Sequence, residues 1–575
     1  MAGGREVDLF NNSLTRSGLS TTANKVNGGK TLYNSTNWQN TNTLTYDKKF
    51  NKNHSLNVLG GMTMEAGKSS VFGATAILLP NETLGLNGLD EGNPSTITSF
   101  STDWSQMSFL SRVNYSLKSK YLFTASVRAD GSSRFTGDNK WGFFPSGAFA
   151  WRLGSEEFVK KYKFISNAKL RASWGITGNN LISNYAAYPG ISVDNSSGYS
   201  FGNNLQKGSY ASILGNSNLR WESTEQTDLG LDLGFFKERL TITADVYRKN
   251  TEDLLLNADQ ALSTGYERQL MNIGKVRNEG LEISVGFIPV DKKLRWSSEF
   301  NISFNRNKVV ALADEQSYLL TSMRWGDDWG NIYPYIAQVG GPIAQVYGYL
   351  FDGVYRAEDF DIDGSGSQVL KYDRPANGED RAGIKPGDIR YKDINGDLLI
   401  NESDKTIIAQ PYPIHTGGFN NNFEYKGFDL NVFFQWSYGN DIINANRQML
   451  ESGYKYNTNQ FASYANRWSP ENPDSDIPAA KGITMKAYST RIIEDGSYLR
   501  LKTVAFGYTL PKRMLQRLRV GSLRVYASAQ NLHTWTKYSG YDPEVSVRRS
   551  ALTPGFDYSA YPRAKTLTFG LNATF

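Results

Sequence analysis

The sequence lacks the features that mark three common classes of protein. Its 575 residues include no cysteine, so neither a disulfide framework nor a cysteine-based metal site can form. No apolar run approaches the roughly 18 residues that a membrane-spanning helix needs, which excludes helical membrane proteins. Lys and Arg number 62 against 56 Asp and Glu, without a basic stripe, and so we expect no nucleic-acid partner.

Linkers and catalytic patterns are missing as well. No Pro-rich, Ser-rich or single-charge run divides the chain, so the simpler expectation is one large architecture over residues 1–575. The three histidines, His54, His415 and His533, stand far apart in the sequence. There is no Gly-x-Ser-x-Gly elbow and no paired-histidine zinc motif. We therefore expect no enzymatic activity and no required cofactor.

What the chain does have is alternation of apolar and polar residues, which is clearest at its end. Every second residue of the last stretch is apolar: Leu567, Phe569, Leu571, Ala573 and Phe575. Successive side chains of a strand point to opposite faces, so these five share one face. The pattern runs to the carboxylate and stops on an aromatic, which is typical of the last strand of an outer-membrane barrel. Residues 240–247, 428–438 and 523–530 repeat it.

Many alternating segments form pairs joined by short polar turns. The pairs are 42–50 with 54–65, 106–118 with 121–130, 223–236 with 239–249, 277–289 with 293–306, and 412–425 with 427–438. Long segments separate them: 66–104, 177–222, 308–342, 351–391 and 441–493. Short turns at one end and long loops at the other are typical of transmembrane barrels. The sequence therefore predicts an all-β, transmembrane antiparallel β-barrel with about sixteen strands, surrounded by the lipid bilayer of the cell outer membrane.

Two local irregularities are expected. Leu499 and Leu501 lie on one face of a strand while Val504 and Phe506 lie on the other, which predicts a bulge near 502–503. Residues 441–450 follow a strand and begin with an acidic residue, which favours a small helix. The first ten residues lack the apolar core of a secretory signal. A barrel protein must cross the inner membrane, so we expect the chain to be a mature form or a fragment.

The sharpest local motif is a candidate calcium loop at 393–404. Oxygen ligands stand where such a loop needs them, and the apolar Ile400 occupies the eighth position. The ligands would be the side chains of Asp393, Asn395, Asp397, Asn401 and Asp404 and the carbonyl of Leu399. Leu398 stands where the turn prefers glycine, and Asp404 replaces the usual glutamate. The alternative is an Asx-rich turn in an outer loop.

A second candidate site is the aromatic segment 325–335. Its rings belong to Trp325, Trp329, Tyr333 and Tyr335, and polar residues separate them. Flat aromatic faces beside hydrogen-bonding groups suit a carbohydrate or peptide ligand. The alternative is that these rings pack the loop or contact a partner protein.

Several short phrases, in order along the chain, resemble the SusC/RagA family of TonB-dependent outer-membrane transporters. They are residues 42–50, 54–61, 128–135, 340–349, 386–393, 498–502, 507–511 and 529–532. The resemblance implies a 22-strand barrel around an amino-terminal plug, which imports oligosaccharides or peptides. It also implies a SusD-like surface lipoprotein as a lid, and energy from the TonB system acting through the plug.

The chain departs from that pattern at its amino-terminal side. We find no plug, no TonB-interaction segment and no amino-terminal domain in the sequence, and the first barrel strands are missing. We therefore expect residues 1–575 to be the carboxy-terminal, partial barrel of a transporter.

Two alternatives belong to other classes. A surface glycan-binding β protein, such as a propeller, would show a repeat of about 40 to 50 residues, which we do not find. A passive diffusion porin would fit about sixteen strands, but the long loops argue against it. Single-channel conductance would separate a porin from an importer.

Overall fold

The computed structural model describes most of the chain. The described residues are 2–12, 26–80, 83–313, 316–324, 332–453, 458–480, 487–515, 520–548 and 550–575. No helix among them is long and apolar enough to cross a membrane. The two aromatic residues Trp325 and Trp329 lie outside the described residues.

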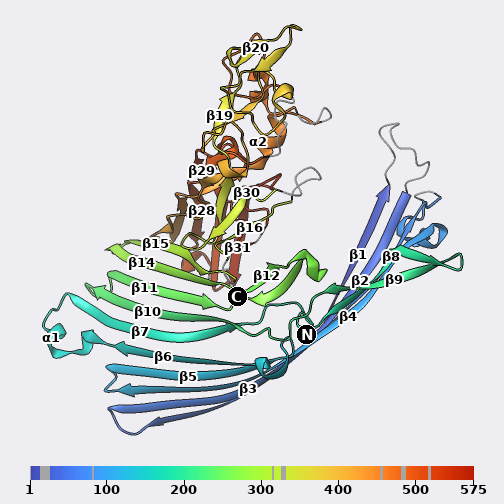
Figure 1. The fold of residues 1–575 in the computed structure, drawn as a ribbon. Helices are drawn as coiled ribbons and strands as arrows, with labels where there is room; N and C mark the ends of the chain where they lie inside the picture. Colours follow the sequence, from blue (N-terminus) through green and yellow to red (C-terminus); the bar gives the residue numbers. More distant parts are fainter. Residues whose placement is uncertain are drawn as a thin grey trace. The chain divides into compact units, whose positions relative to one another are not determined.

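Within the described residues, sixteen strands form one large sheet, as the alternation predicted. In sheet order they are β1 (Ala2–Asn12), β2 (Val26–Lys49), β3 (His54–Ile77), β4 (Asn93–Leu117), β5 (Tyr121–Ser132), β6 (Trp141–Trp151), β7 (Ile165–Asn179), β10 (Glu222–Phe235), β11 (Leu240–Glu252), β14 (Lys275–Asp291), β15 (Leu294–Ala311), β24 (His415–Tyr425), β25 (Phe428–Tyr438), β28 (Tyr498–Thr509), β29 (Ser522–Thr536) and β31 (Thr566–Thr574). The order follows the sequence, so consecutive strands of the sheet are neighbours in space (Figure 1).

Smaller sheets and short helices occupy the long connections. The additional strands are β8 (Gly190–Phe201), β9 (Asn204–Ile213), β12 (Leu255–Asp259), β13 (Arg268–Asn272), β16 (Tyr318–Thr321), β17 (Tyr335–Gln338), β18 (Gln345–Gly348), β19 (Phe351–Val354), β20 (Phe360–Ile362), β21 (Gln368–Leu370), β22 (Ile389–Tyr391), β23 (Thr406–Ala409), β26 (Asp441–Asn444), β27 (Ile493–Asp495) and β30 (Phe556–Asp557). The α-helices are α1 (Glu157–Lys160), α2 (Ala445–Leu450) and α3 (Lys512–Leu515).

The chain divides into two compact units. Unit 1 comprises Met1–Trp151, Ala172–Thr227 and Thr251–Gly274. Its hairpins are long and regular: β2 pairs with β3 from Asn27↔Ile77 to Lys49↔Ser55. A cluster of buried apolar side chains surrounds Phe135, Leu219 and Trp221 of the connections and includes Phe144 of β6. Unit 1 is thus a set of paired strands with a small core in its long connections.

Unit 2 comprises Arg152–Arg171, Asp228–Asn250 and Lys275–Phe575. Its strands are joined alternately by short turns and by long segments that fold into the small sheets and α2. In Figure 1, α2, β19 and β20 lie beyond the ends of β28 and β29. The largest buried cluster is in these long segments and includes Tyr335, Val346 and Phe556. The outer loops of unit 2 therefore carry a hydrophobic core of their own.

Two local predictions can be compared with the structure. β25 pairs with β28 as Phe433↔Thr503 and then Phe434↔Leu501, which skips Lys502. The predicted bulge is therefore confirmed. The predicted helix 441–450 is only half right, because residues 441–444 form β26, which pairs with β27, and the helix begins at Ala445. Pairing with a distant strand outweighs the local helical preference there.

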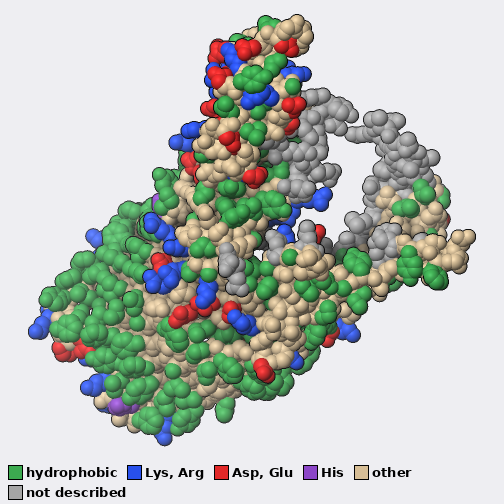
Figure 2. Space-filling model, in the orientation of Figure 1, with side chains coloured by type: hydrophobic (Ala, Val, Ile, Leu, Met, Phe, Trp, Pro, Cys, Tyr) green, Lys and Arg blue, Asp and Glu red, His purple; other side chains and the backbone are tan. Residues whose placement is uncertain are grey.

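One face of the final strands is apolar and exposed. The side chain of Phe569 is 81% exposed and that of Leu571 is 61% exposed, although both lie in a well-paired strand. Their neighbours across the strand pair are Ala527 and Val525. Figure 2 shows that hydrophobic side chains also gather on the surface of the strands next to α1. A soluble protein would bury such a face, whereas a bilayer covers it with hydrocarbon.

We expect Leu571→Lys to destabilise the fold by about 2 to 4 kcal/mol in a bilayer, because a charge on the lipid face near its centre loses its hydration. Asn572→Lys, on the opposite face of the same strand, is the matched control and should cost far less. Denaturant unfolding in phospholipid vesicles, followed by tryptophan fluorescence, measures both. Equal losses for the two variants would contradict a lipid-facing side.

Candidate functional site

A tyrosine-lined pocket lies in the long segments of unit 2. It has a volume of about 470 Å³ and lies between the sheet β16-β17-β18-β23 and the candidate calcium loop. Its lining consists of Leu320, Ile332, Tyr333, Tyr347, Gly348, Tyr349, Glu402, Lys405, Ala487 and Tyr488. The pocket thus joins Tyr333, from the predicted aromatic segment, to Glu402, from loop 393–404.

The tyrosines offer both flat faces and hydroxyl groups. Tyr333 is 41% exposed, whereas Tyr349 is buried. Tyr347 and Tyr349 are two residues apart in extended chain, so their side chains emerge on the same side of it. Burial, and then the nearby Glu402 carboxylate, raises the pKa of both hydroxyls. Both therefore stay protonated at neutral pH and can donate hydrogen bonds.

An ion pair forms the polar side of the pocket. The Nζ of Lys405 lies 2.6 Å from Oε1 of Glu402 and 5.5 Å from the centre of the Tyr349 ring. The lysine side chain is largely buried, while the glutamate is exposed. Glu402 can therefore contact a ligand while Lys405 stays fixed against the aromatic wall.

Loop 393–404 positions this ion pair by internal hydrogen bonds. The Asp393 carboxylate accepts the backbone N–H groups of Gly396 at 2.6 Å and Leu398 at 2.8 Å. The buried Asp404 carboxylate accepts the N–H groups of Ile394 and Asn401, each at 2.9 Å. Leu398 has a φ of 62°, the left-handed conformation that glycine normally supplies at this position of a calcium loop. Leu398 therefore adopts the backbone conformation of that glycine although it carries a side chain.

Calcium binding by this loop stays a prediction. Its hydrogen bonds are those of Asx-type turns, which form without a metal. Asp397 accepts the N–H of Leu399 at 2.9 Å, and this backbone bond, followed by one from Asn395, lowers the pKa of its carboxyl group. Across the described residues, no group of three or more His, Asp or Glu side chains is placed to hold a metal ion.

The structure places the two described residues of the predicted aromatic site in different surroundings. Tyr333 lies in the pocket, so ligand contact stays a prediction for it. Tyr335 is 1% exposed and packs in the hydrophobic core, where its hydroxyl donates a hydrogen bond to the carbonyl of Pro554 at 2.6 Å. Tyr335 does not line the pocket, and its ring packs among the buried residues of that core. Tyr335, Ile336 and Ala337 of β17 are all buried, because both faces of this short strand are covered.

Nine of the ten lining residues were not among the predicted site residues, and they include Tyr347, Tyr349, Glu402 and Lys405. The alternation of Tyr347 and Tyr349 was a usable signal, because it places two tyrosines on one side of a strand. The contribution of Glu402 and Lys405 depends on the folding of a distant loop.

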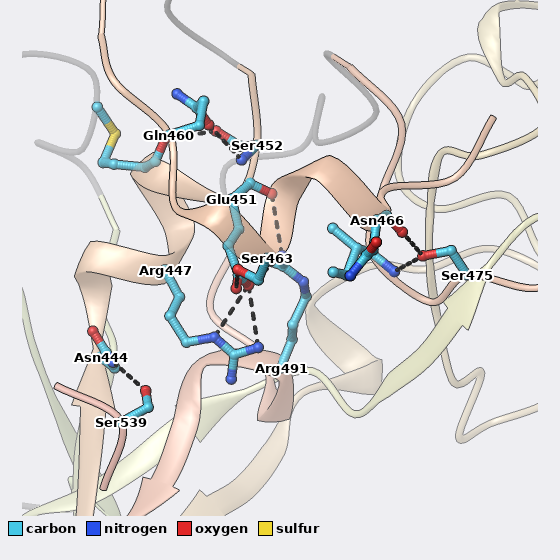
Figure 3. A network of polar contacts seen from close by, with 12 residues as sticks. Asn444, Arg447, Glu451, Ser452, Gln460, Ser463, Asn466, Ser475, Arg491 and Ser539 are labelled. Carbon is cyan, nitrogen blue, oxygen red and sulfur yellow. Dashed lines mark hydrogen bonds and ion pairs between the residues drawn. The ribbon is translucent and has the colours of Figure 1, made fainter. Parts of the chain in front are cut away.

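A buried ionic network supports the segment behind the pocket (Figure 3). Arg491 lies shortly after Ala487 and Tyr488 of the pocket wall, and its Nη2 is 3.1 Å from Oε2 of Glu451. Arg447 contacts the same carboxylate at 3.1 Å, and Ser463 donates a hydrogen bond to it at 2.5 Å. Burial lowers the pKa of Arg491 to about 10, so it stays charged at neutral pH.

A second cavity of about 750 Å³ lies on the polar side of the same unit. Its lining includes Phe433, Gln435, Tyr498, Glu544 and Arg563. Beside it, the side chain of Arg500 of β28 is only 2% exposed. Its guanidinium contacts Asp542 at 2.5 Å and Glu544 at 2.8 Å, which ties the connection between β29 and β31 to the wall. This cavity therefore has charged groups at fixed positions.

Comparisons with known proteins agree with this architecture. Residues 5–532 match the sequence model of a family described as TonB dependent receptor-like, β-barrel. TonB-dependent receptor P3 of Formosa agariphila is 37% identical over 564 residues, which cover 95% of this chain and 53% of that protein. TonB-dependent receptor SusC of Bacteroides thetaiotaomicron is 32% identical over 491 residues, covering 83% of this chain and 44% of SusC. The chain thus spans about half the length of these relatives.

Among solved structures, that of the RagAB peptide transporter superposes with a TM-score of 0.80 at 24% identity. The superposition covers 100% of this chain and 59% of that chain. At this identity the likeness concerns the fold.

We expect Arg500→Met to destabilise the protein by about 3 to 5 kcal/mol, because it leaves the buried Asp542 carboxylate without its counter-charge. Arg248→Met is the control, since Arg248 is exposed and pairs with the exposed Glu279 at 2.7 Å. Such a surface pair contributes about 1 kcal/mol or less. Denaturant unfolding in detergent measures both losses, and a small loss for Arg500→Met would show that its contacts do not hold the connection.

If the loop binds calcium, millimolar calcium should raise the melting temperature of the chain, because a ligand that binds only the folded state stabilises it. Asp397→Asn removes one charged ligand while its amide oxygen can still accept the Leu399 N–H. The calcium-dependent rise should therefore shrink in this variant, as measured by differential scanning fluorimetry with chelator as the baseline. No rise in the unsubstituted chain would exclude structural calcium.

Proposed function

Because the chain belongs to the TonB-dependent receptor-like β-barrel family, we propose that it forms the barrel wall of an active importer of oligosaccharides or peptides. The family comprises outer-membrane transporters and receptors, not enzymes. Import would draw energy from the TonB system, and a SusD-like lipoprotein would close the outer side. The observation that carries the proposal is the family match over most of the chain, together with its resemblance to SusC.

The tyrosine pocket is the proposed contact for the nutrient. Aromatic faces gain from stacking on the apolar face of a sugar ring or on a peptide side chain. The Glu402 carboxylate and the tyrosine hydroxyls would orient hydroxyl or amide groups of the same ligand. A peptide ligand is supported by the fold likeness to a transporter described as a peptide transporter, and an oligosaccharide by the aromatic lining.

The polar face of the barrel wall would line the path along which the nutrient passes. The second cavity offers amide, carboxylate and guanidinium groups from Gln435, Glu544 and Arg563. Such groups can exchange hydrogen bonds with a polar solute in place of water. The barrel would perform no covalent chemistry.

We expect Tyr347→Ala to weaken ligand binding about tenfold, because it removes one stacking face from the pocket. Tyr372→Ala is the matched control: its ring is exposed in an outer segment and does not line the pocket. Calorimetric titration of the purified chain with oligosaccharide and oligopeptide mixtures would identify the class and measure both variants. Undiminished binding by Tyr347→Ala would remove the pocket from the proposal.

Uptake tests the transport itself. Whole-length transporter genes with and without Tyr347→Ala would be returned to a strain that lacks the transporter, and growth on the bound nutrient compared. Growth that persists after loss of the TonB system would favour passive diffusion. Binding without any uptake would favour a surface glycan-binding protein.

A further inference from the structure

The short turns of unit 2 lie along one edge of its strands. Backbone hydrogen bonds link neighbouring turns in series: Phe236 to Phe164 at 2.8 Å, Ile288 to Arg239 at 2.7 Å, and Thr509 to Gly427 at 2.7 Å. A cavity of about 690 Å³ is lined by Lys292, Lys426 and Thr509, so the turn at Lys292 lies next to the turn at Lys426 and the end of β28. The turns are therefore one continuous edge.

This turn edge, defined as residues 152–164, 236–239, 291–295, 424–428 and 511–515, is strongly basic. It holds twelve Lys and Arg against five Asp and Glu, a net charge of +7, while the whole chain has a net charge of +6. The basic residues are all exposed: Arg152, Lys160, Lys161, Lys163, Lys237, Arg239, Lys292, Lys293, Arg295, Lys426, Lys512 and Arg513. Positive charge is therefore concentrated on this edge.

The opposite sign prevails in one long segment of the same unit. Residues 351–404 hold thirteen Asp and Glu against seven Lys and Arg, a net charge of −6. The short turns of unit 2 are thus net positive, whereas this long segment is net negative. Solubility alone does not require such sorting, since mixed charges on every connection would serve equally well.

Exposed aromatic and apolar side chains accompany the basic ones. They are Phe158, Tyr162, Phe164, Phe236, Leu294, Tyr425, Phe428 and Met514. The Nζ of Lys426 lies 5.2 Å from the centre of the Tyr425 ring. Figure 2 shows basic side chains at the margin of the hydrophobic surface beside α1. Aromatic rings with long cationic side chains just beyond them suit the boundary between hydrocarbon and headgroups.

We propose that the turn edge binds anionic phospholipids of the inner leaflet of the outer membrane. The short turns of outer-membrane barrels face the periplasm, which places this edge at that leaflet. Clustered lysines attract anionic headgroups, and the attraction falls off within a Debye length. The rings hold the edge at the depth where lysine ammonium groups meet the phosphates. The lipid contact is independent of which nutrient is imported.

Five lysines distributed over the edge provide the test variant, K161Q/K237Q/K292Q/K293Q/K426Q. The matched control, K140Q/K207Q/K385Q/K392Q/K537Q, removes the same charge from exposed lysines outside the short turns. Both chains and the unsubstituted chain are reconstituted in nanodiscs of equimolar phosphatidylglycerol and phosphatidylcholine. Native mass spectrometry then counts the lipids that stay bound.

The unsubstituted chain should retain phosphatidylglycerol over phosphatidylcholine by about threefold or more. The turn variant should lose this preference and the control should keep it. Equal retention of both lipids by the unsubstituted chain, or an equal loss in both variants, would overturn the proposal. If the turn variant does not fold, the unsubstituted chain is equilibrated at increasing salt concentration instead. Its preference for phosphatidylglycerol should then shrink, because salt screens the attraction. A preference that does not change with salt would contradict the proposal.

Discussion

The structure depends on one constraint, which is that strands in contact with hydrocarbon must satisfy every backbone N–H and C=O group among themselves. Between its edge strands β1 and β31, the large sheet meets it by pairing consecutive strands. β2 pairs with β3 without a register shift, and β14 pairs with β15 with two irregularities. Because the backbone is satisfied by pairing, alternate side chains are free to face lipid. This is why Phe569 and Leu571 can be exposed in a well-ordered strand.

The same constraint explains where the hydrophobic core lies. The face of the sheet that meets lipid needs no protein partner, so buried clusters form in the long connections instead. In unit 2 those connections fold around Tyr335, Val346 and Phe556, and the Glu451–Arg491 and Arg500–Asp542 pairs fix their ends. Rigid outer segments can then hold Tyr347, Tyr349 and Glu402 at fixed positions around a pocket. The proposed nutrient contact is a consequence of this secondary core.

Sequence patterns predicted the strands well and the site only partly. A period of two is set by the pleat of a strand, so alternation revealed the hairpins, and the change of phase around Lys502 revealed the bulge. The pocket depends on segments far apart in the sequence, and no local pattern shows that Glu402 approaches Tyr349. Tyr335 was expected beside Tyr333 as a ligand contact because both are aromatic, but Tyr335 packs in the core whereas Tyr333 is 41% exposed, and no local pattern shows this difference. Asp441 to Asn444 formed a strand because β27 was there to pair with it.

The most direct measurement uses the absence of cysteine, since single cysteines can be introduced into a silent background. A spin label placed in turn at each position from 567 to 574, with the chain in phospholipid vesicles, would report its access to oxygen and to a water-soluble nickel complex. The account predicts that oxygen access alternates with a period of two, high at 567, 569, 571 and 573, while access to nickel is low at those positions. High access to nickel at 569 and 571 would show that water, and not hydrocarbon, covers this face, and would contradict the assignment to the outer membrane.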